Sequence, residues 1–128
     1  MNHLHVLHVD DEPDIREVAA LSLELDGAMT LTSAASGADA LGLLERGSRP
    51  DVILLDVMMP VLDGPGALAR LRLLPGHEKT PVIFMTARAQ STELSRYIGL
   101  GAVGVIVKPF DPMSLAASVR DTLAGAGG

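Results

Sequence analysis

The sequence predicts an α/β domain, a doubly wound sheet in which five parallel strands alternate with five helices. Five short apolar segments recur along the 128 residues, and most are too short and too continuously apolar to be amphipathic. Such segments are typical of parallel strands covered on both faces. The connections between them leave room only for right-handed crossovers. The predicted strands are Leu4–Val9, Met29–Ala34, Val52–Leu55, Val82–Met85 and Val103–Val107. We expect them to form one five-stranded parallel sheet in the flavodoxin-like order 2-1-3-4-5.

The first two predicted helices are bounded by residues that favour helix ends. Proline is favoured in the first turn of a helix and glycine just after the last, which predicts a helix between Pro13 and Gly27. We expect one face of this helix, here called its stripe, to consist of Ile15, Val18, Ser22 and Leu25. The second helix is expected to be capped by Ser36 and to run to Arg46, before Gly47.

The last three predicted helices follow the same logic. One helix is expected to begin at Pro65 and to end before Pro75 and Gly76. Another is expected to run from about Ser91 to Leu100 and to end at Gly101. For the last helix, Asp111 is the expected N-cap and Pro112 the first helical residue, with a face of Leu115, Val119 and Leu123. We expect residues 1–124 to form one domain and the Gly-rich residues 125–128 a flexible tail.

Composition excludes several classes of function. The chain has no cysteine, which rules out a disulfide framework, a thiolate metal site and a cysteine nucleophile. Its net charge of −6, without any run of lysine or arginine, argues against direct binding to nucleic acid. No apolar stretch reaches the roughly 18 residues of a membrane span, and the N-terminus lacks the pattern of a signal peptide. We therefore expect a cytoplasmic protein that binds no membrane.

Chemically active side chains follow four of the five predicted strands. The first strand runs into Asp10-Asp11-Glu12, the third into Asp56, the fourth into Thr86 and the fifth into Lys108-Pro109. Because ligands of open α/β sheets bind outside the carboxyl ends of the strands, we expect these residues to share one pocket. Each residue alone has a simpler interpretation as a cap, turn or solvated side chain. Their joint arrival at one edge favours a functional site.

The charges at this edge predict a cation. Asp10, Asp11 and Asp56 would crowd three negative charges together, which is unfavourable unless a cation joins them. Mg²⁺ suits carboxylate oxygens and often keeps a phosphate as a further ligand. With the ammonium of Lys108 and the hydroxyl of Thr86, the edge would cradle a phosphoryl group. Asp56, alone on a central strand, is the candidate nucleophile that would form an acyl phosphate.

Four motifs, in this order, resemble the receiver domain of two-component response regulators, in its chemotaxis-type, single-domain form. The resemblance covers essentially the whole chain. The motifs are the acidic pair in Asp10-Asp11-Glu12, the phosphoacceptor segment from Asp56 through Met58-Met59-Pro60 to Asp63-Gly64, the switch hydroxyl in Thr86-Ala87 and the lysine motif Lys108-Pro109-Phe110.

The resemblance implies a role for each residue. Asp56 would accept the phosphoryl group from a phosphohistidine of a sensor histidine kinase or phosphotransfer protein. Mg²⁺ would be bound by Asp11, by Asp56 and by the backbone carbonyl of Met58, with Asp10 acting through water. Lys108 would pair with the phosphoryl oxygens, and Thr86, followed by Ala87, would move to bond one of them. The bond before Pro109 is expected to be cis.

The resemblance also implies a switch that signals to a downstream protein, as a monomer or as a phosphorylation-dependent dimer. It would catalyse only its own phosphorylation and dephosphorylation. One position departs from the family pattern. Val105 stands three residues before Lys108, where the family often has an aromatic ring that swings inward, so the usual aromatic readout cannot operate.

Two other functions are open to the same residues. A dehalogenase-type phosphatase also uses an aspartate with Mg²⁺ on a doubly wound sheet, but it needs Asp-x-Asp after the first strand and this chain has Asp10-Asp11-Glu12. A degenerate receiver would act only as a binding scaffold.

The Gly-x-Gly-x-x-Gly pattern at 99–104 follows a helix and precedes a strand, the reverse of the dinucleotide-binding context. His3, His5 and His8 are interpreted as structural or surface residues.

Overall fold

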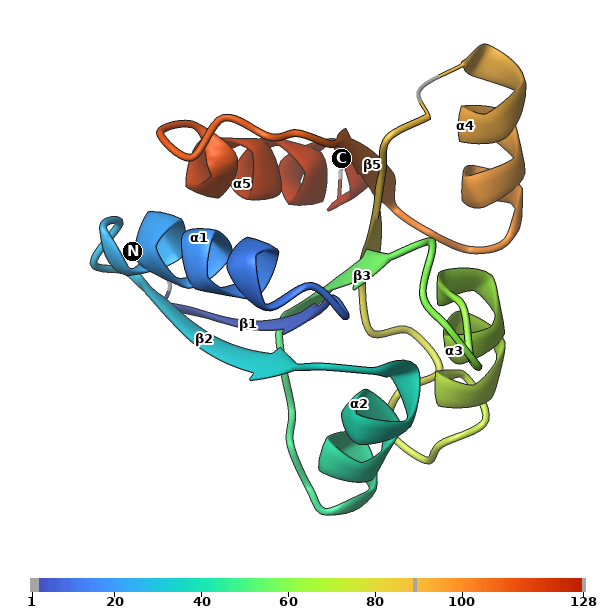
Figure 1. Cartoon of the computed structure of the whole chain (residues 1–128). Coiled ribbons are helices and arrows are strands. Elements are labelled where there is room, and N and C mark those ends of the chain that lie inside the picture. Colours follow the sequence, from blue (N-terminus) through green and yellow to red (C-terminus); the bar gives the residue numbers. More distant parts are fainter. Residues whose placement is uncertain (1–2, 89, 128) are drawn as a thin grey trace.

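The computed structural model of the chain describes residues 3–88 and 90–127 and confirms the predicted fold. Five parallel strands form one sheet in the order β2-β1-β3-β4-β5 (Figure 1). The strands are β1 (Leu4–Val9), β2 (Met29–Ala34), β3 (Val52–Asp56), β4 (Val82–Thr86) and β5 (Gly104–Val107). The helices are α1 (Pro13–Glu24), α2 (Gly37–Glu45), α3 (Gly64–Leu71), α4 (Ser91–Gly99) and α5 (Leu115–Gly127).

Helices cover both faces of the sheet and enclose two apolar clusters. On one face, side chains of β1 such as Leu7 pack with Leu68 of α3 and Tyr97 of α4. On the other face, Val6 packs with Leu23 of α1 and Val119 of α5. In Figure 1, α1 and α5 accordingly lie side by side on one face, with α2 and α3 on the other. The sheet is therefore buried on both sides, as continuous apolar strands require.

The predicted stripe of α1 is confirmed at Ser22 but is wrong at Val18 and Leu25. The residues that α1 buries are Ala19, Ser22 and Leu23, whereas Val18 is 38% and Leu25 is 75% exposed. Apolar side chains occupy both the inner and the outer face of this helix, so their spacing alone did not identify the face that meets the sheet. The helix also ends earlier than predicted, at Glu24, and a turn leads to Gly27 at a positive φ of 78°.

The start of α5 also differs from the prediction. The Asp111 carboxylate accepts a hydrogen bond from the Met113 backbone N–H (2.9 Å), and the Asp111 carbonyl accepts one from the Ser114 N–H (3.0 Å). These bonds close a turn, and the helix begins after it, at Leu115. The predicted face is confirmed by full burial of Val119. The helix continues to Gly127, so residues 125–127, predicted to be a tail, lie in its last turns.

The other helices match their predicted caps more closely. The Ser36 hydroxyl accepts a hydrogen bond from the Asp39 N–H (3.0 Å) at the start of α2. The Asp63 carboxylate caps α3 in the same way, so this helix begins one residue before Pro65. It ends at Leu71, before Pro75, and α4 ends at Gly99. None of the helices within residues 3–88 and 90–127 is long and apolar enough to cross a membrane.

Candidate functional site

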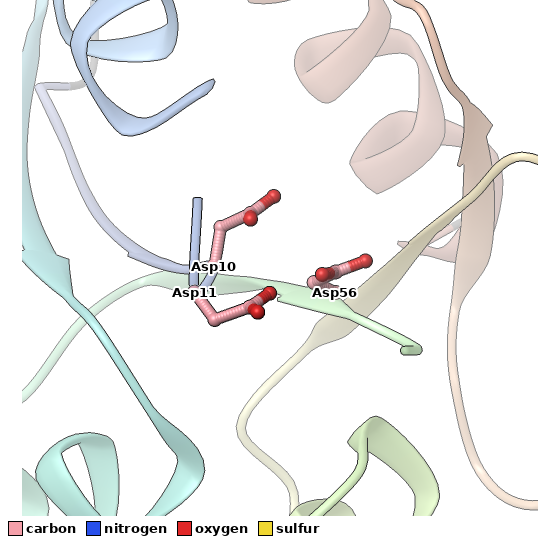
Figure 2. A group of neighbouring side chains, drawn as sticks. All are labelled: Asp10, Asp11 and Asp56. Atoms are coloured by element: carbon pink, nitrogen blue, oxygen red, sulfur yellow. The ribbon is translucent and has the colours of Figure 1, made fainter. Parts of the chain in front are cut away.

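Three carboxylates meet at the carboxyl end of the two central strands. Val9 of β1 pairs with Leu55 of β3, so the residues that follow, Asp10 and Asp56, lie side by side at the edge of the sheet. Asp11 comes next along the chain, and one oxygen of each carboxylate lies within 4.8 Å of those of the other two (Figure 2). Asp10 is fully buried and Asp56 is 4% exposed. Three acidic groups are thus held close together, two of them buried and the third, Asp11, open to solvent.

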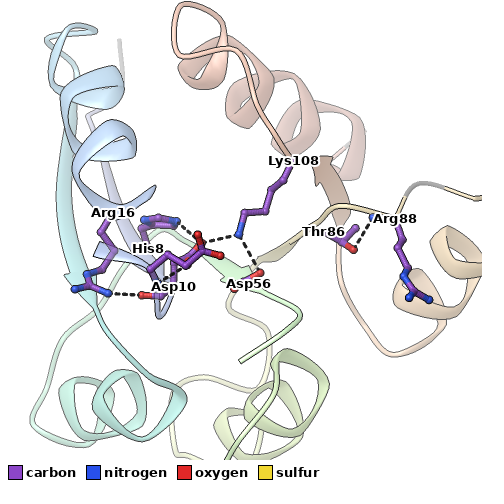
Figure 3. Close-up of polar contacts among 8 residues, drawn as sticks. His8, Asp10, Arg16, Asp56, Thr86, Arg88 and Lys108 are labelled. Atoms are coloured by element: carbon purple, nitrogen blue, oxygen red, sulfur yellow. Dashed lines mark hydrogen bonds and ion pairs between the residues drawn. The ribbon is translucent and has the colours of Figure 1, made fainter. Parts of the chain in front are cut away.

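Lys108 bridges two of these carboxylates. Its Nζ donates to Oδ2 of Asp10 at 2.8 Å and to Oδ1 of Asp56 at 3.2 Å (Figure 3). The backbone helps to place it, because the Lys108 N–H donates to the carbonyl of Thr86 at 2.8 Å. The Lys108–Pro109 peptide bond is cis, the isomer that the resemblance implies. The ammonium therefore stands where the negative charges converge.

The pocket shifts the pKa of both Asp56 and Lys108. Burial raises the pKa of Asp56 to about 6, and the charge of Asp10 adds to the rise, while Lys108 opposes it. Burial opposes the charge of Lys108, but its hydrogen bond to Asp10 and the two negative charges outweigh burial and raise the pKa of the ammonium. Lys108 therefore stays charged beside a carboxylate that is costly to ionise.

The remaining predicted residues line a cavity of about 300 Å³ beside Asp56 and Lys108. Its lining includes Thr86, Ala87, Pro109 and Met58, with Glu12 and Ile15 on the α1 side. Thr86 is 4% exposed, and its hydroxyl oxygen accepts a hydrogen bond from the Arg88 backbone N–H at 3.0 Å. Met58 is 78% exposed at the rim. The structure thus brings all of the predicted site residues to one edge of the sheet.

Close packing behind Asp56 fixes the loop that follows β3. The Gly64 N–H donates to the carbonyl of Val57 at 2.9 Å. A Cβ atom at Gly64 would lie 2.6 Å from the backbone oxygen of Asp56 and 2.9 Å from Cα of Val57. Only glycine lets α3 begin this close to the strand that carries Asp56.

The carboxylate group has the chemistry of a site for a small hard cation. Mg²⁺ prefers oxygen ligands and is usually held by one or two carboxylates together with waters and phosphate oxygens. The three neighbouring carboxylates supply more negative charge than Lys108 alone can balance, so the donor set fits this ion. Within the part of the chain that the structure describes, no other group of three or more metal-ligating side chains occurs.

Two residues near Asp10 were missed in the sequence. The imidazole of His8 is fully buried, with Nε2 4.0 Å from Oδ2 of Asp10. Burial lowers the pKa of His8 to about 4, although the negative charge of Asp10 acts to raise it. Arg16 donates from Nη1 to the backbone carbonyl of Asp10 at 2.7 Å. Strand alternation, which separates His8 from His5, places His8 on the same face as Asp10, and that signal could have identified it.

The family of the chain follows from comparison with known proteins. Residues 6–120 match the family described as the response regulator receiver domain. This chain belongs to that family. Receiver domains accept a phosphoryl group from a histidine kinase and change conformation, and they generally bind Mg²⁺ at an acidic cluster. The predicted family and its general function are confirmed.

Relatives of known sequence or structure agree with this assignment. The chain is 40% identical over 119 residues to the transcriptional regulatory protein CseB of Streptomyces avermitilis, an alignment that covers 93% of this chain and 48% of CseB. It is 36% identical to the response regulator Rre1 of Synechocystis, covering 94% and 52%. The chemotaxis response regulator CheY4 of Vibrio cholerae has a similar fold, with a TM-score of 0.85, 30% identity and coverage of 94% and 99%. The chain thus spans about half the length of CseB and Rre1 and nearly all of the CheY4 structure.

Proposed function

We propose that this receiver domain takes a phosphoryl group from a phosphohistidine onto Asp56, in a reaction that needs Mg²⁺, and then signals to a partner protein. The observation that supports this most is the double contact of Lys108 with Asp10 and Asp56 in a buried acidic pocket. A cation poised at a carboxylate can stabilise the charge that develops on a transferring phosphoryl group.

In the proposed reaction, a carboxylate oxygen of Asp56 attacks phosphorus and the bond from phosphorus to the imidazole nitrogen breaks. The leaving nitrogen keeps the electron pair, and an acyl phosphate remains on Asp56. Lys108 then exchanges its contacts with Asp10 and Asp56 for a phosphoryl oxygen, which its flexible ammonium can do without loss of charge. Asp11, Asp56 and the backbone carbonyl of Met58 would hold Mg²⁺, with Asp10 reached through water. The ion supplies positive charge against the phosphoryl oxygens.

Thr86 is the residue through which we propose that the signal leaves the pocket. Its hydroxyl oxygen now accepts from the backbone N–H of Arg88. When the hydroxyl turns toward a phosphoryl oxygen, this contact changes and carries the segment before α4 with it. Because Val105 replaces the usual aromatic, we expect loop movement to alter the surface of α4, β5 and α5. Backbone amide shifts confined to the pocket on phosphorylation would contradict this route.

The experiment that tests the function is labelling with a small phosphodonor. The protein is incubated with acetyl phosphate and Mg²⁺, and base-labile phosphate is measured on the wild type, Asp56→Asn and Asp10→Asn. A receiver loses the label in Asp56→Asn and retains it in Asp10→Asn. A dehalogenase-type phosphatase would show the opposite pattern, and a scaffold would show no label at all. Asp56 lines the cavity whereas Asp10 is fully buried outside its lining, which disfavours Asp10 as the nucleophile.

The partners follow from the chemistry of the proposed reaction. The donor would be a sensor histidine kinase or a phosphotransfer protein, and the recipient of the signal a downstream protein in the cytoplasm rather than DNA. We propose that the domain includes the whole of α5, to Gly127, and promotes only its own phosphorylation and dephosphorylation. Comparing its mass in solution with and without a phosphoryl mimic distinguishes a constant monomer from a dimer that depends on phosphorylation.

A further inference from the structure

His8 is a buried polar residue whose hydrogen-bonding groups are not used by the proposed reaction. Its side chain is fully buried on β1, and neither Nδ1 nor Nε2 has a hydrogen-bond partner among the residues that the structure describes. Buried polar groups are nearly always paired, because an unpaired one forfeits its bonds to water. The orphaned imidazole therefore requires an explanation beyond packing.

His8 lies close to the carboxylate oxygen of Asp10 that Lys108 already contacts. Nε2 of His8 lies 4.0 Å from Oδ2 of Asp10, and Nζ of Lys108 lies 2.8 Å from the same oxygen. Figure 3 shows the imidazole and the ammonium approaching this carboxylate together. The 4.0 Å gap is about one ångström longer than a hydrogen bond. A small movement of the carboxylate toward the imidazole would close it.

Asp10 needs a replacement partner when Lys108 leaves it. The other oxygen, Oδ1, is held by the backbone N–H of Glu12 at 2.9 Å, and the backbone carbonyl is held by Arg16. Oδ2, in contrast, has Lys108 as its hydrogen-bond donor. A water shared with Mg²⁺ could donate to this carboxylate, but Asp10 and His8 are both fully buried, so solvent does not reach the side of Oδ2 that faces the imidazole. Without a donor on that side, the carboxylate oxygen would oppose any state in which Lys108 has moved.

We infer that His8 is a positioning residue that donates from Nε2–H to Oδ2 of Asp10 once Lys108 has moved to the phosphoryl group. The inference rests on the proposed function for the event that moves Lys108. Before phosphorylation the imidazole makes no hydrogen bond to Asp10. After phosphorylation its hydrogen bond holds the Asp10 carboxylate in place. The unpaired nitrogen is then a cost of the resting state that the phosphorylated state relieves.

The first test removes Lys108 without any phosphodonor. In ¹⁵N-histidine-labelled protein, Lys108→Met should shift the Nε2 nitrogen and proton signals of His8 to those of a hydrogen-bonded N–H. The signals of His3, His5 and His77, which lie away from the pocket, are the internal controls. A His8 spectrum that matches the wild type in Lys108→Met would overturn the inference, whether or not Asp56 is ever phosphorylated.

The second test uses beryllium fluoride with Mg²⁺ as a phosphoryl mimic. His8→Gln can place an amide N–H near the position of Nε2, whereas His8→Asn reaches only the position of Nδ1 and His8→Leu has no donor. We expect His8→Leu and His8→Asn to bind the mimic about tenfold more weakly than the wild type, the size expected for one lost bond to a charged group, and His8→Gln to restore binding.

The outcomes separate His8 from the proposed function. Equal affinity in all four proteins, or equal weakening in all three variants, would show that His8 only fills space and would overturn the inference. Failure of the wild type to bind the mimic would count against the proposed function instead, and the Lys108→Met spectrum would still decide the role of His8. Thermal unfolding of each variant confirms that the compared proteins are folded.

Discussion

The fold holds two residues of this region, Asp56 and Val61, in unfavourable states. Asp56 is buried beside a second carboxylate, and its pKa is raised to about 6 by burial first and by Asp10 second. In the loop between β3 and α3, Val61 adopts a φ of 69°, and its side chain is fully exposed. Burial and a neighbouring charge impose the state of Asp56, and the path of the loop backbone imposes that of Val61. Each cost can be measured by substitution.

The raised pKa of Asp56 predicts how stability changes with pH when metal is absent. Between about pH 4 and pH 6 the folded protein keeps a proton that the unfolded chain has released, so Asp56 makes the free energy of unfolding fall as pH rises. Asp56→Asn removes this contribution. With EDTA present, we expect the variant to gain on the order of 2 kcal/mol over the wild type between pH 4 and pH 7. A pH-independent difference in urea unfolding would contradict the prediction.

Relief of the backbone at Val61 should stabilise the protein. A β-branched residue is disfavoured in the left-handed region, where asparagine is tolerated far better. The exposed valine side chain makes little packing that could be lost. We therefore expect Val61→Asn to raise the free energy of unfolding by about 1 kcal/mol in a urea titration. Leu73→Asn, at another exposed apolar position, is the control for a general effect of surface polarity and should not be stabilising.

At the scale of elements, the sequence predicts strands better than helix faces. The strands are short apolar runs that are buried on both sides, so their identity does not depend on choosing a face. Exposed Val18 in α1 and exposed Leu25 just after it were predicted to face the sheet, and only the packing of Leu23 against the sheet identifies the buried face. Likewise, the local hydrogen bonds of Asp111 delay the start of α5, and composition alone does not predict them.

An ion pair joins the turn after α1 to α5, away from the pocket. Both terminal guanidinium nitrogens of Arg120, Nη1 and Nη2, donate to the Asp26 carboxylate, and this hydrogen bonding lowers the pKa of Asp26 to about 2. Its stabilising effect is therefore full above about pH 4 and is lost as pH falls toward 2. We expect Asp26→Asn to lower the thermal midpoint at pH 7 and to lose that difference near pH 2.

The control for this ion pair is Asp51→Asn. Asp51 accepts a hydrogen bond from the backbone N–H of His5 and takes part in no ion pair within the described ranges 3–88 and 90–127. It tests whether any lost carboxylate gives the same pH profile. High salt should weaken the Asp26 effect, because Arg120 is partly exposed. An Asp26→Asn effect that persists unchanged at pH 2 would contradict the assignment.

The approach of α3 to β3 gives a sharper prediction at this scale. An added Cβ at Gly64 would meet the backbone of Asp56 and Val57 at less than 3.0 Å, so Gly64→Ala must displace the strand end. We expect a loss of about 1 to 3 kcal/mol in stability and slower labelling of Asp56 by acetyl phosphate. Gly42→Ala is the matched control, because its Cβ in α2 would meet only the flexible end of Arg46. That variant should be stabilised by roughly 0.5 to 1 kcal/mol.

For the whole molecule, the site could be predicted because parallel strands end at one edge. Asp10, Asp56, Thr86 and Lys108 are distant in sequence, and the strand order alone brings them together. Strand alternation places His8 on the same face as Asp10, but the distance between the two side chains could not be predicted. That distance depends on how deep below the edge the imidazole lies and on which oxygen of Asp10 it faces. Those are properties of side-chain packing, which no motif encodes.

The convergence of charges also predicts how the molecule responds to Mg²⁺. An ion that binds the folded pocket and not the unfolded chain stabilises the fold, by about 2.7 kcal/mol at a hundred times its Kd. We expect MgCl₂ to raise the unfolding midpoint at pH 7 beyond NaCl of matched ionic strength. Asp11→Asn should lose this rise in the unfolding midpoint. Asp121→Asn, an equal change of charge at an exposed position of α5, should keep it. Equal responses in both variants would mean that Mg²⁺ acts through general charge screening, because only a local site distinguishes Asp11 from Asp121.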